Sequence, residues 1–250
     1  MRLALLSDIH SNLEALQACL EHARQQGADQ LAFLGDMVGY GANPAGVVER
    51  IRQACAEGAV ALRGNHDVMA LQPPGQINTL GESTALWTHQ QLSESHRTWI
   101  DTLPLTLHLD TILLVHASAD APAKWHYVYD GRSAAASLDG AQAWPGVRYV
   151  LGGHVHEQSL YYRGATDGLM KFTPQPGVAV PVPRHRHWLA TVGSVGQPRD
   201  GNPASMYALL DTTRAQLTFY RVPYDTAAAA AAIRRAGLPD FFALRLETGI

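Results

Sequence analysis

Residues 2–12 have the sequence RLALLSDIHSN, an apolar run that ends in polar residues with metal-binding side chains. The run Leu3–Leu6 predicts a buried strand, and the apolar spacing over 12–26 predicts a helix directly after it. Open α/β sheets bind their ligands at the carboxyl ends of the strands. Asp8 and His10 therefore stand where a functional site is expected.

The alternation of strand and helix continues along the chain. Strands are predicted at 31–34 and 60–62 with a helix from Pro44 between them, which gives a βαβαβ order and implies a parallel sheet. Four later strands, from residue 159 onward, are expected to form a second, mixed or antiparallel sheet. All the strands predicted after the first three lie at 105–109, 111–115, 147–151, 159–162, 188–192, 206–210 and 217–222.

A length of 250 residues favours one α/β domain over 1–250. Polar helical patterns predict a helical insertion at about 68–103, over one edge of the sheet. Residues 174–187 contain four prolines and are expected to form an irregular excursion. Six alanines at 227–232 predict a helix in a C-terminal helical tail that begins at about residue 225.

Composition limits the classes of partner. With 46% hydrophobic and 16% charged residues the chain can bury a core, and a net charge of −3 gives no broad basic field for a nucleic-acid polymer. No apolar stretch of 18 residues occurs, so no membrane partner is expected. Cys19 and Cys55 lie in alanine-rich helical stretches and are interpreted as buried free thiols. Together with the lack of a signal-peptide pattern, they favour a cytoplasmic protein.

Five predicted strands end in side chains that bind metals. A single Asp or His after a strand is more often a turn former or a helix cap, but five such ends together favour a shared site. Two metals need a bridging carboxylate, and Asp36 is the expected bridge. Oxygen and nitrogen donors without a thiolate suit Mn, Fe, Zn, Co or Ni better than Ca. The candidate ligands are Asp8, His10 and His156 for one metal and Asn65, His116 and His154 for the other.

The order of these residues resembles the five-block signature of the calcineurin-like metallophosphoesterases. A sixth segment, residues 193–201 followed by a strand, resembles the C-terminal block of the small bacterial branch. The resemblance implies a double β-sandwich with flanking helices, a dinuclear transition-metal centre, with manganese as the first expectation, and attack on phosphorus by metal-activated hydroxide. The five blocks are Asp8-x-His10, Gly35-Asp36, Gly64-Asn65-His66-Asp67, His116 and Gly153-His154-x-His156.

The resemblance also implies catalytic roles for His66 and Asp67. In this family the histidine of the Gly-Asn-His block is a general acid toward the leaving oxygen, and Asp67 is expected to be the partner of His66. The phosphoprotein phosphatases of the family continue the Gly-Asp block with an Asp that orients this histidine and an Arg that binds phosphate. Here Gly39 and Tyr40 occupy those places, which argues against a dedicated phosphoprotein phosphatase.

The candidates for the group that binds phosphate are Arg63, Arg199 and a histidine of the insertions. The aromatic stretch 125–129 is interpreted either as a platform for a nucleobase or as packing of an inserted segment. We expect a metal-dependent phosphoesterase acting on phosphodiester or phosphoanhydride bonds of small phosphorylated, nucleotide-like substrates. The alternatives are a broad phosphomonoesterase or protein phosphatase, and a non-catalytic scaffold of the same fold. The sequence does not define the oligomeric state.

Overall fold

A computed structural model of the protein describes residues 1–164 and 168–250 and contains two six-stranded sheets. Strand β1 (Arg2–Leu6) lies in the middle of the first sheet. It pairs in parallel with β2, which pairs in parallel with β3, as the βαβαβ order predicts, and its other edge pairs antiparallel with β11. The strands of this sheet, in spatial order, are β3 (Val60–Ala61), β2 (Gln30–Phe33), β1, β11 (Ser205–Asp211), β12 (Gln216–Val222) and β9 (Ala179–Pro181).

The second sheet joins strands from the middle of the chain. Its central strand β10 pairs in parallel with β6 and antiparallel with β7. In spatial order the strands are β4 (Thr106–Leu109), β5 (Ile112–Val115), β6 (Tyr149–Gly152), β10 (Trp188–Val192), β7 (Gln158–Arg163) and β8 (Leu169–Phe172).

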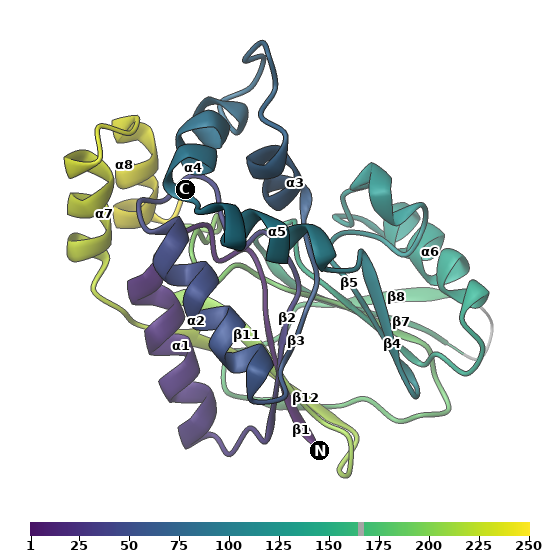
Figure 1. Ribbon diagram of the computed structural model, residues 1–250. Helices are drawn as coiled ribbons and strands as arrows, with labels where there is room; N and C mark the ends of the chain where they lie inside the picture. Colours follow the sequence, from purple (N-terminus) through teal and green to yellow (C-terminus); the bar gives the residue numbers. More distant parts are fainter. Residues whose placement is uncertain (165–167) are drawn as a thin grey trace.

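The two sheets pack face to face, and helices cover both outer faces (Figure 1). Side chains alternate along β1, so that Leu3 and Leu5 enter the core between the sheets while Ala4 and Leu6 pack toward the helices. This is the α-β-β-α layering that the resemblance implies. The helices are α1 (Leu13–Gln25), α2 (Pro44–Ala56), α3 (Asn65–Leu71), α4 (Ala85–Gln91), α5 (Glu94–Thr102), α6 (Gly131–Gly140), α7 (Thr226–Arg235) and α8 (Asp240–Thr248).

Helices α1 and α2 cover the first sheet, and α6 covers the second. The segment predicted as a helical insertion contains α4, α5 and most of α3. The tail helices α7 and α8 pack against each other and against Tyr40 and Trp87, at the same end of the molecule as α3 and α4 (Figure 1). Among the described residues, no helix has the length and apolar character needed to cross a membrane.

The predicted division of strands between the sheets is wrong in part. Strands β7 and β10 belong to the second sheet, but β11 and β12 belong to the first, where β11 pairs with β1 and β12 pairs with β11. The excursion predicted at 174–187 also contains β9, which pairs with β12, and strand β8 was not predicted. Both missed strands are short edge strands, where Pro181 is tolerated and the apolar periodicity is weak.

The two sheets meet tightly where the loops after β1 and β6 touch. Gly153 follows β6, and a Cβ atom added there would overlap Ser7 Oγ and Asp8 Oδ2. A hydrogen bond of 2.8 Å from the main-chain N–H of His154 to Asp8 Oδ2 crosses the same contact. The close approach of the two loops therefore requires a glycine at position 153.

We predict that Gly153→Ala lowers the free energy of unfolding by about 1–3 kcal/mol, because a methyl group overfills this contact. Urea denaturation measures the change. Gly75→Ala is the matched control, since nothing lies within 4 Å of an added Cβ there. Equal stability of the two variants would contradict the assignment.

Candidate metal centre

The structure brings all seven candidate ligands together at the carboxyl ends of strands from both sheets. The ligand atoms of Asp8, Asp36, His116 and His154 lie within 4.8 Å of one another, as do those of Asp8, His10 and His156. Each ligand follows a strand, six of them in loops and Asn65 at the start of α3. Asp8 and His10 follow β1, Asp36 follows β2, Asn65 follows β3, His116 follows β5, and His154 and His156 follow β6.

One group of donors surrounds Asp8. Its Oδ1 lies 3.2 Å from His156 Nε2 and 3.7 Å from His10 Nε2. The two imidazole Nε2 atoms are themselves 3.1 Å apart. Three ligand atoms from two loops therefore face a single point.

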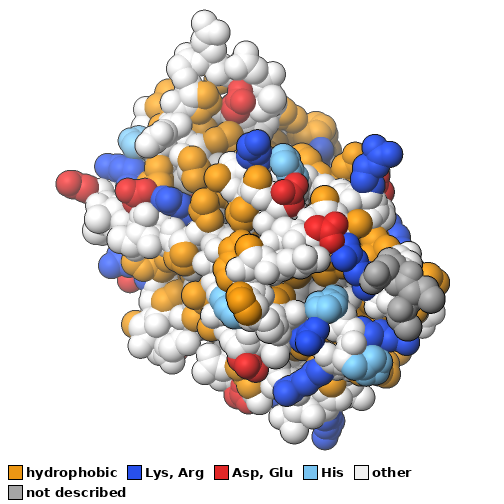
Figure 2. Space-filling view, turned by 90° about the vertical axis from the view of Figure 1, so that its right-hand side faces the viewer, with side chains coloured by type: hydrophobic (Ala, Val, Ile, Leu, Met, Phe, Trp, Pro, Cys, Tyr) orange, Lys and Arg blue, Asp and Glu red, His pale blue; other side chains and the backbone are white. Residues whose placement is uncertain are grey.

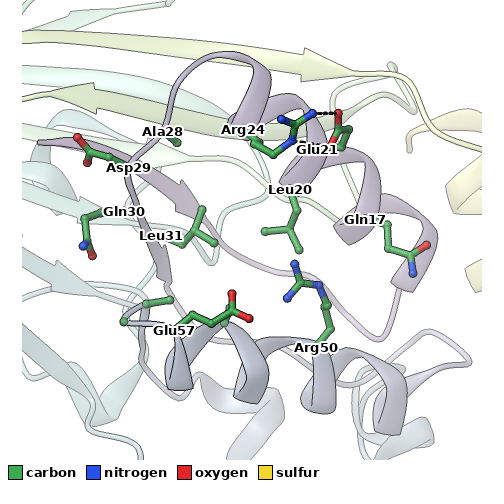
Figure 3. A pocket seen from close by; sticks show the side chains of 13 residues that line it. Gln17, Leu20, Glu21, Arg24, Ala28, Asp29, Gln30, Leu31, Arg50 and Glu57 are labelled. Carbon is green, nitrogen blue, oxygen red and sulfur yellow. Dashed lines mark hydrogen bonds and ion pairs between the residues drawn. The ribbon is translucent and has the colours of Figure 1, made fainter.

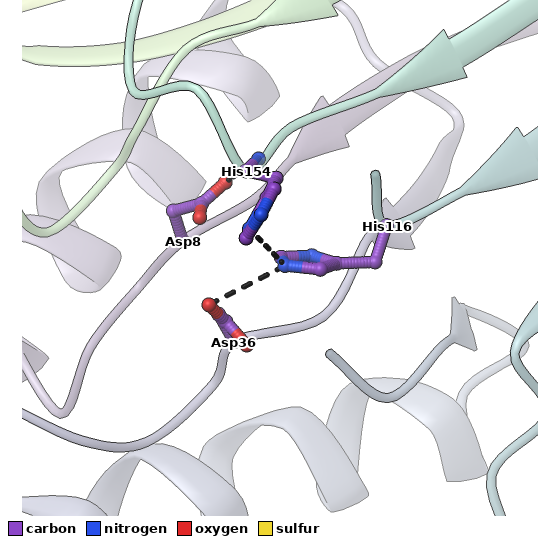
Figure 4. Close-up of side chains that lie close together, drawn as sticks. All are labelled: Asp8, Asp36, His116 and His154. Atoms are coloured by element: carbon purple, nitrogen blue, oxygen red, sulfur yellow. Dashed lines mark hydrogen bonds and ion pairs between the residues drawn. The ribbon is translucent and has the colours of Figure 1, made fainter. Parts of the chain in front are cut away.

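A second group surrounds His116 (Figure 4). Its Nε2 lies 3.3 Å from Asp36 Oδ2, 3.2 Å from His154 Nδ1 and 3.1 Å from Asn65 Oδ1. Asp36 Oδ2 is also 3.9 Å from His10 Nε2, which belongs to the first group. The Asp36 carboxylate thus lies between the two groups of donors.

Main-chain carbonyl oxygens fix the tautomers of three histidines. The Nδ1–H group of His10 donates to Val38 O at 3.2 Å. That of His116 donates to Leu34 O at 2.8 Å, and that of His156 donates to Gln197 O at 2.6 Å. A carbonyl oxygen only accepts, so in each neutral ring Nε2 carries the lone pair. Each of these rings directs a metal-binding atom into the cluster.

The donor set fits a cation. Asp8 Oδ1 and Asp36 Oδ2 are buried and have no hydrogen-bond partner among the described residues. Burial opposes ionisation of both carboxyls, but His156 beside Asp8 and His116 beside Asp36 outweigh it and hold each pKa below its usual range. Buried carboxylates need positive charge beside them, which protonated imidazoles supply when no metal is bound and which a cation held between the oxygens and the Nε2 atoms would supply in their place.

The pKa values of the imidazoles follow from burial and from neighbouring charge. Burial, with repulsion from His116, lowers the pKa of His154 to about 4, and burial with repulsion from His156 and His66 holds that of His10 well below its usual value. Burial also acts on His116, but the Asp36 carboxylate outweighs it and raises the pKa of His116 to about 9. A metal at Asp36 would replace that proton.

Backbone strain gathers at the same place. Five candidate ligands have a left-handed backbone, a conformation that residues other than glycine rarely adopt. Such strain is typical of functional sites, where the surroundings impose it. The five residues are Asp8 (φ 53°), His10 (φ 49°), Asp36 (φ 50°), His154 (φ 68°) and His156 (φ 63°).

A sequence model described as the calcineurin-like phosphoesterase superfamily domain matches residues 1–215. The chain belongs to this family. It is therefore a metal-dependent hydrolase that acts on phosphate esters, as its sequence predicts.

Three relatives show how far the likeness extends. An uncharacterised protein of Methanocaldococcus jannaschii, MJ0912, is 30% identical over 253 residues, covering 99% of this chain and 98% of that protein. A metallophosphoesterase of Sphaerobacter thermophilus has a crystal structure that matches with a TM-score of 0.86 at 31% identity, over 100% of this chain and 99% of that one. Phosphodiesterase YfcE of Escherichia coli is 39% identical over 75 residues, 27% of this chain and 40% of YfcE.

His66 and Asp67 lie in the first turn of α3, and their contacts differ from each other. The ligand atom of His66 lies within 4.8 Å of those of His10 and Asp36, and burial lowers its pKa although Asp36 acts in the opposite direction. Asp67 instead accepts main-chain N–H groups from Met37, Val38 and Gly64 at 2.8–3.2 Å. The carboxylate of Asp67 thus fixes the loops that carry Asp36 and His66, so it is a positioning residue and not the expected direct partner of the His66 ring.

Of the two candidate arginines for phosphate binding, Arg199 lies nearer the centre. Arg63 pairs with Asp101 at 2.7 Å, and His89 of the insertion binds Ala70 O at 2.8 Å. The guanidinium carbon of Arg199 lies 5.7 Å from the centre of the Tyr40 ring, which itself lies 4.5 Å from the ring of His10.

The aromatic stretch 125–129 borders the metal centre, a position that no local pattern indicates. The Tyr127 ring stacks on that of His154 at 4.0 Å, and the Trp125 ring meets that of His116 edge-on at 5.7 Å. Trp125 also has a left-handed backbone, with φ at 54°. Tyr127 is 53% exposed, so it can contact a substrate as well as cover His154.

Two cavities lie away from this centre. One, of about 480 Å³ between α1 and α2, is lined by polar and charged side chains that include Glu21 and Arg24, which pair with each other (Figure 3). The other, of about 400 Å³, is lined in part by Arg163, Arg186 and His187. Figure 2 shows one face of the molecule, with several Lys or Arg side chains in blue and His side chains in pale blue. Neither cavity is lined by a candidate metal ligand.

We predict that Asp36→Asn removes most of the bound metal, because it deletes the charge shared by both groups of donors. Elemental analysis of protein reconstituted with Mn²⁺ measures this. Asp110→Asn is the control, since Asp110 is an exposed turn residue with a similar φ of 53°. Metal content equal to wild type in Asp36→Asn would contradict the assignment.

Proposed function

We propose that this phosphoesterase hydrolyses phosphodiester or phosphoanhydride bonds of small nucleotide-like substrates with two transition-metal ions. The observation that carries the proposal is the position of Asp36 Oδ2, 3.3 Å from His116 Nε2 and 3.9 Å from His10 Nε2. One carboxylate within reach of two sets of donors is what a pair of ions needs. The oxygen and imidazole donors favour manganese, iron, zinc, cobalt or nickel.

The bond type is supported by likeness and by the surroundings of His66. YfcE, which shares 39% identity over 75 residues, is a phosphodiesterase by name. Gly39 lies against the His66 ring, where an added Cβ would approach Nδ1 to 2.7 Å, so this chain has no room there for the Asp of the phosphoprotein phosphatases. Both points favour a diester or an anhydride of a small molecule over a phosphoprotein.

The proposed substrate size agrees with the enclosure of the centre. His66 is 7% exposed, and Tyr40, Tyr127 and Gly81 lie close around the reacting groups. Helix α8 closes one side through the contact of Phe242 with Tyr40, whose ring centres are 5.0 Å apart. A folded protein surface would have to displace these segments, whereas a small molecule would not.

When bound, the ions supply a Lewis acid for the phosphoryl oxygens and a lowered pKa for the attacking water. The chain itself positions the donors through Val38 O, Leu34 O and Gln197 O. We assign His66 as the group that donates a proton to the leaving oxygen, since its ring lies beside His10 and Asp36 and no carbonyl of the described residues directs it as a ligand.

A substrate panel tests the proposed bond type. We predict that Mn²⁺-loaded protein hydrolyses bis(p-nitrophenyl) phosphate and a dinucleoside polyphosphate with a kcat/KM at least about 10-fold above that for a phosphopeptide. A chelator should abolish all these activities, because the centre needs its ions. A phosphopeptide as the best substrate, or activity that survives prolonged chelation, would contradict the proposal.

A comparison of two leaving groups distinguishes a proton donor from a metal ligand at His66. We predict that His66→Asn slows hydrolysis of an ester with an alkoxide leaving group by about 10²–10⁴-fold and of a nitrophenyl ester much less, because nitrophenolate leaves without a proton. Metal content should stay near that of wild type. His108→Asn, on the edge strand β4, is the control. A metal-poor variant, or one equally slow with both esters, would refute the assignment.

A further inference from the structure

Gln197 connects the metal centre to two arginines. It is 1% exposed, and its main-chain oxygen accepts the Nδ1–H of His156 at 2.6 Å. Its side-chain Oε1 accepts from Arg199 Nη2 at 2.8 Å and from Arg245 Nη1 at 3.2 Å. Two guanidinium groups therefore converge on one neutral oxygen, which cannot balance two positive charges.

No Asp or Glu side chain in the described part of the chain neutralises the charge of this pair. No side-chain carboxylate there forms an ion pair with Arg199 or Arg245, and Arg199 Nε is buried without a hydrogen-bond partner. Burial and the charge of Arg199 both lower the pKa of Arg245. An anion between the two would relieve their repulsion and use the free N–H groups.

Both guanidinium groups are held in place without the anion. Arg199 lies over the Tyr40 ring, and Arg245 lies 4.4 Å from the centre of the Phe241 ring. Arg245 Nε also donates to the main-chain oxygen of Ile250 at 2.8 Å. A preformed pair loses little conformational entropy when it binds an anion.

The pair lies next to the reacting groups. The Tyr40 ring that carries Arg199 is 4.5 Å from the ring of His10 and 4.4 Å from that of His66. One aromatic ring thus separates the arginines from the metal centre. Neither arginine contacts a candidate metal ligand directly, so a group bound here would be a neighbour of the reacting phosphorus.

We propose that Arg199 and Arg245 bind a second phosphate group of the substrate, next to the one that is hydrolysed. The planar fork of each guanidinium matches the oxygens of a phosphate. This inference rests on the proposed phosphoesterase function and narrows it to substrates with two or more phosphate groups. Arg245 comes from α8, outside the region 1–215 that the family model matches, so the tail supplies this selectivity.

Binding of inorganic phosphate to metal-stripped protein tests the pair without catalysis. Calorimetry should show saturable binding to wild type, weakened about 10-fold or more in Arg199→Gln and in Arg245→Gln, since each loses charged hydrogen bonds. Arg235→Gln removes the same charge from an exposed position on α7 and should bind like wild type. Thermal melting of each variant verifies its fold.

Kinetics of the manganese-loaded enzyme then show which phosphate the pair holds. The KM of a dinucleoside polyphosphate should rise about 10-fold or more in Arg199→Gln and Arg245→Gln, while that of bis(p-nitrophenyl) phosphate, with its single phosphate, stays within about twofold. A rise for both substrates would place the arginines at the scissile phosphate and overturn the proposal.

The binding experiment tests the arginine site and the kinetic experiment tests the reaction, so the two can fail independently. Absence of phosphate binding to metal-stripped wild type, or binding that is unchanged in both arginine variants, overturns the arginine site even if the enzyme is active. Phosphate binding that depends on both arginines supports the site even if neither substrate is hydrolysed, and in that case the proposed reaction is what fails.

Discussion

Two carboxylates, Asp8 and Asp36, must remain ionised at 1% exposure or less, and the arrangement around the centre follows from this constraint. A buried charge is costly unless hydrogen bonds and opposite charge surround it. One oxygen of each is satisfied by a main-chain N–H, from His154 for Asp8 and from His66 for Asp36, both at 2.8 Å. The other oxygen of each has only imidazoles around it, which makes the pair a receptor for cations.

The same constraint explains why the backbone is strained and crowded here. Bringing the loops of both sheets within bonding distance requires left-handed backbones at five ligands, each costing on the order of 1–3 kcal/mol. It also requires Gly64 and Gly153, where an added Cβ would overlap the Asp36 and Asp8 side chains. The central strands and the two faces of the sandwich supply the rigidity that holds these loops. Bound metal would add to that stability, because it binds only the folded arrangement.

Local pattern sufficed for the features that depend on neighbours in sequence. The strand and helix periods of the first 64 residues, and donors placed directly after strands, predicted the parallel part of the first sheet and the convergence of the ligands. Features set by contacts across the chain were missed. Strand β9 is defined by pairing with β12, Tyr127 reaches His154 by a loop with unusual backbone angles, and Arg245 meets Arg199 only because α8 folds back. The expectation for Asp67 failed because adjacency in sequence does not fix which way a carboxylate in a helical turn points.

Asp36, shared by two ions between the two groups of donors, is the feature on which the proposed reaction depends. Anomalous X-ray diffraction from crystals of manganese-reconstituted protein tests it most directly. We expect two anomalous peaks roughly 3.5–4 Å apart, with the Asp36 carboxylate between them, His10 and His156 at one peak, and His116 and His154 at the other. A single peak, or peaks that none of these side chains contacts, would contradict it.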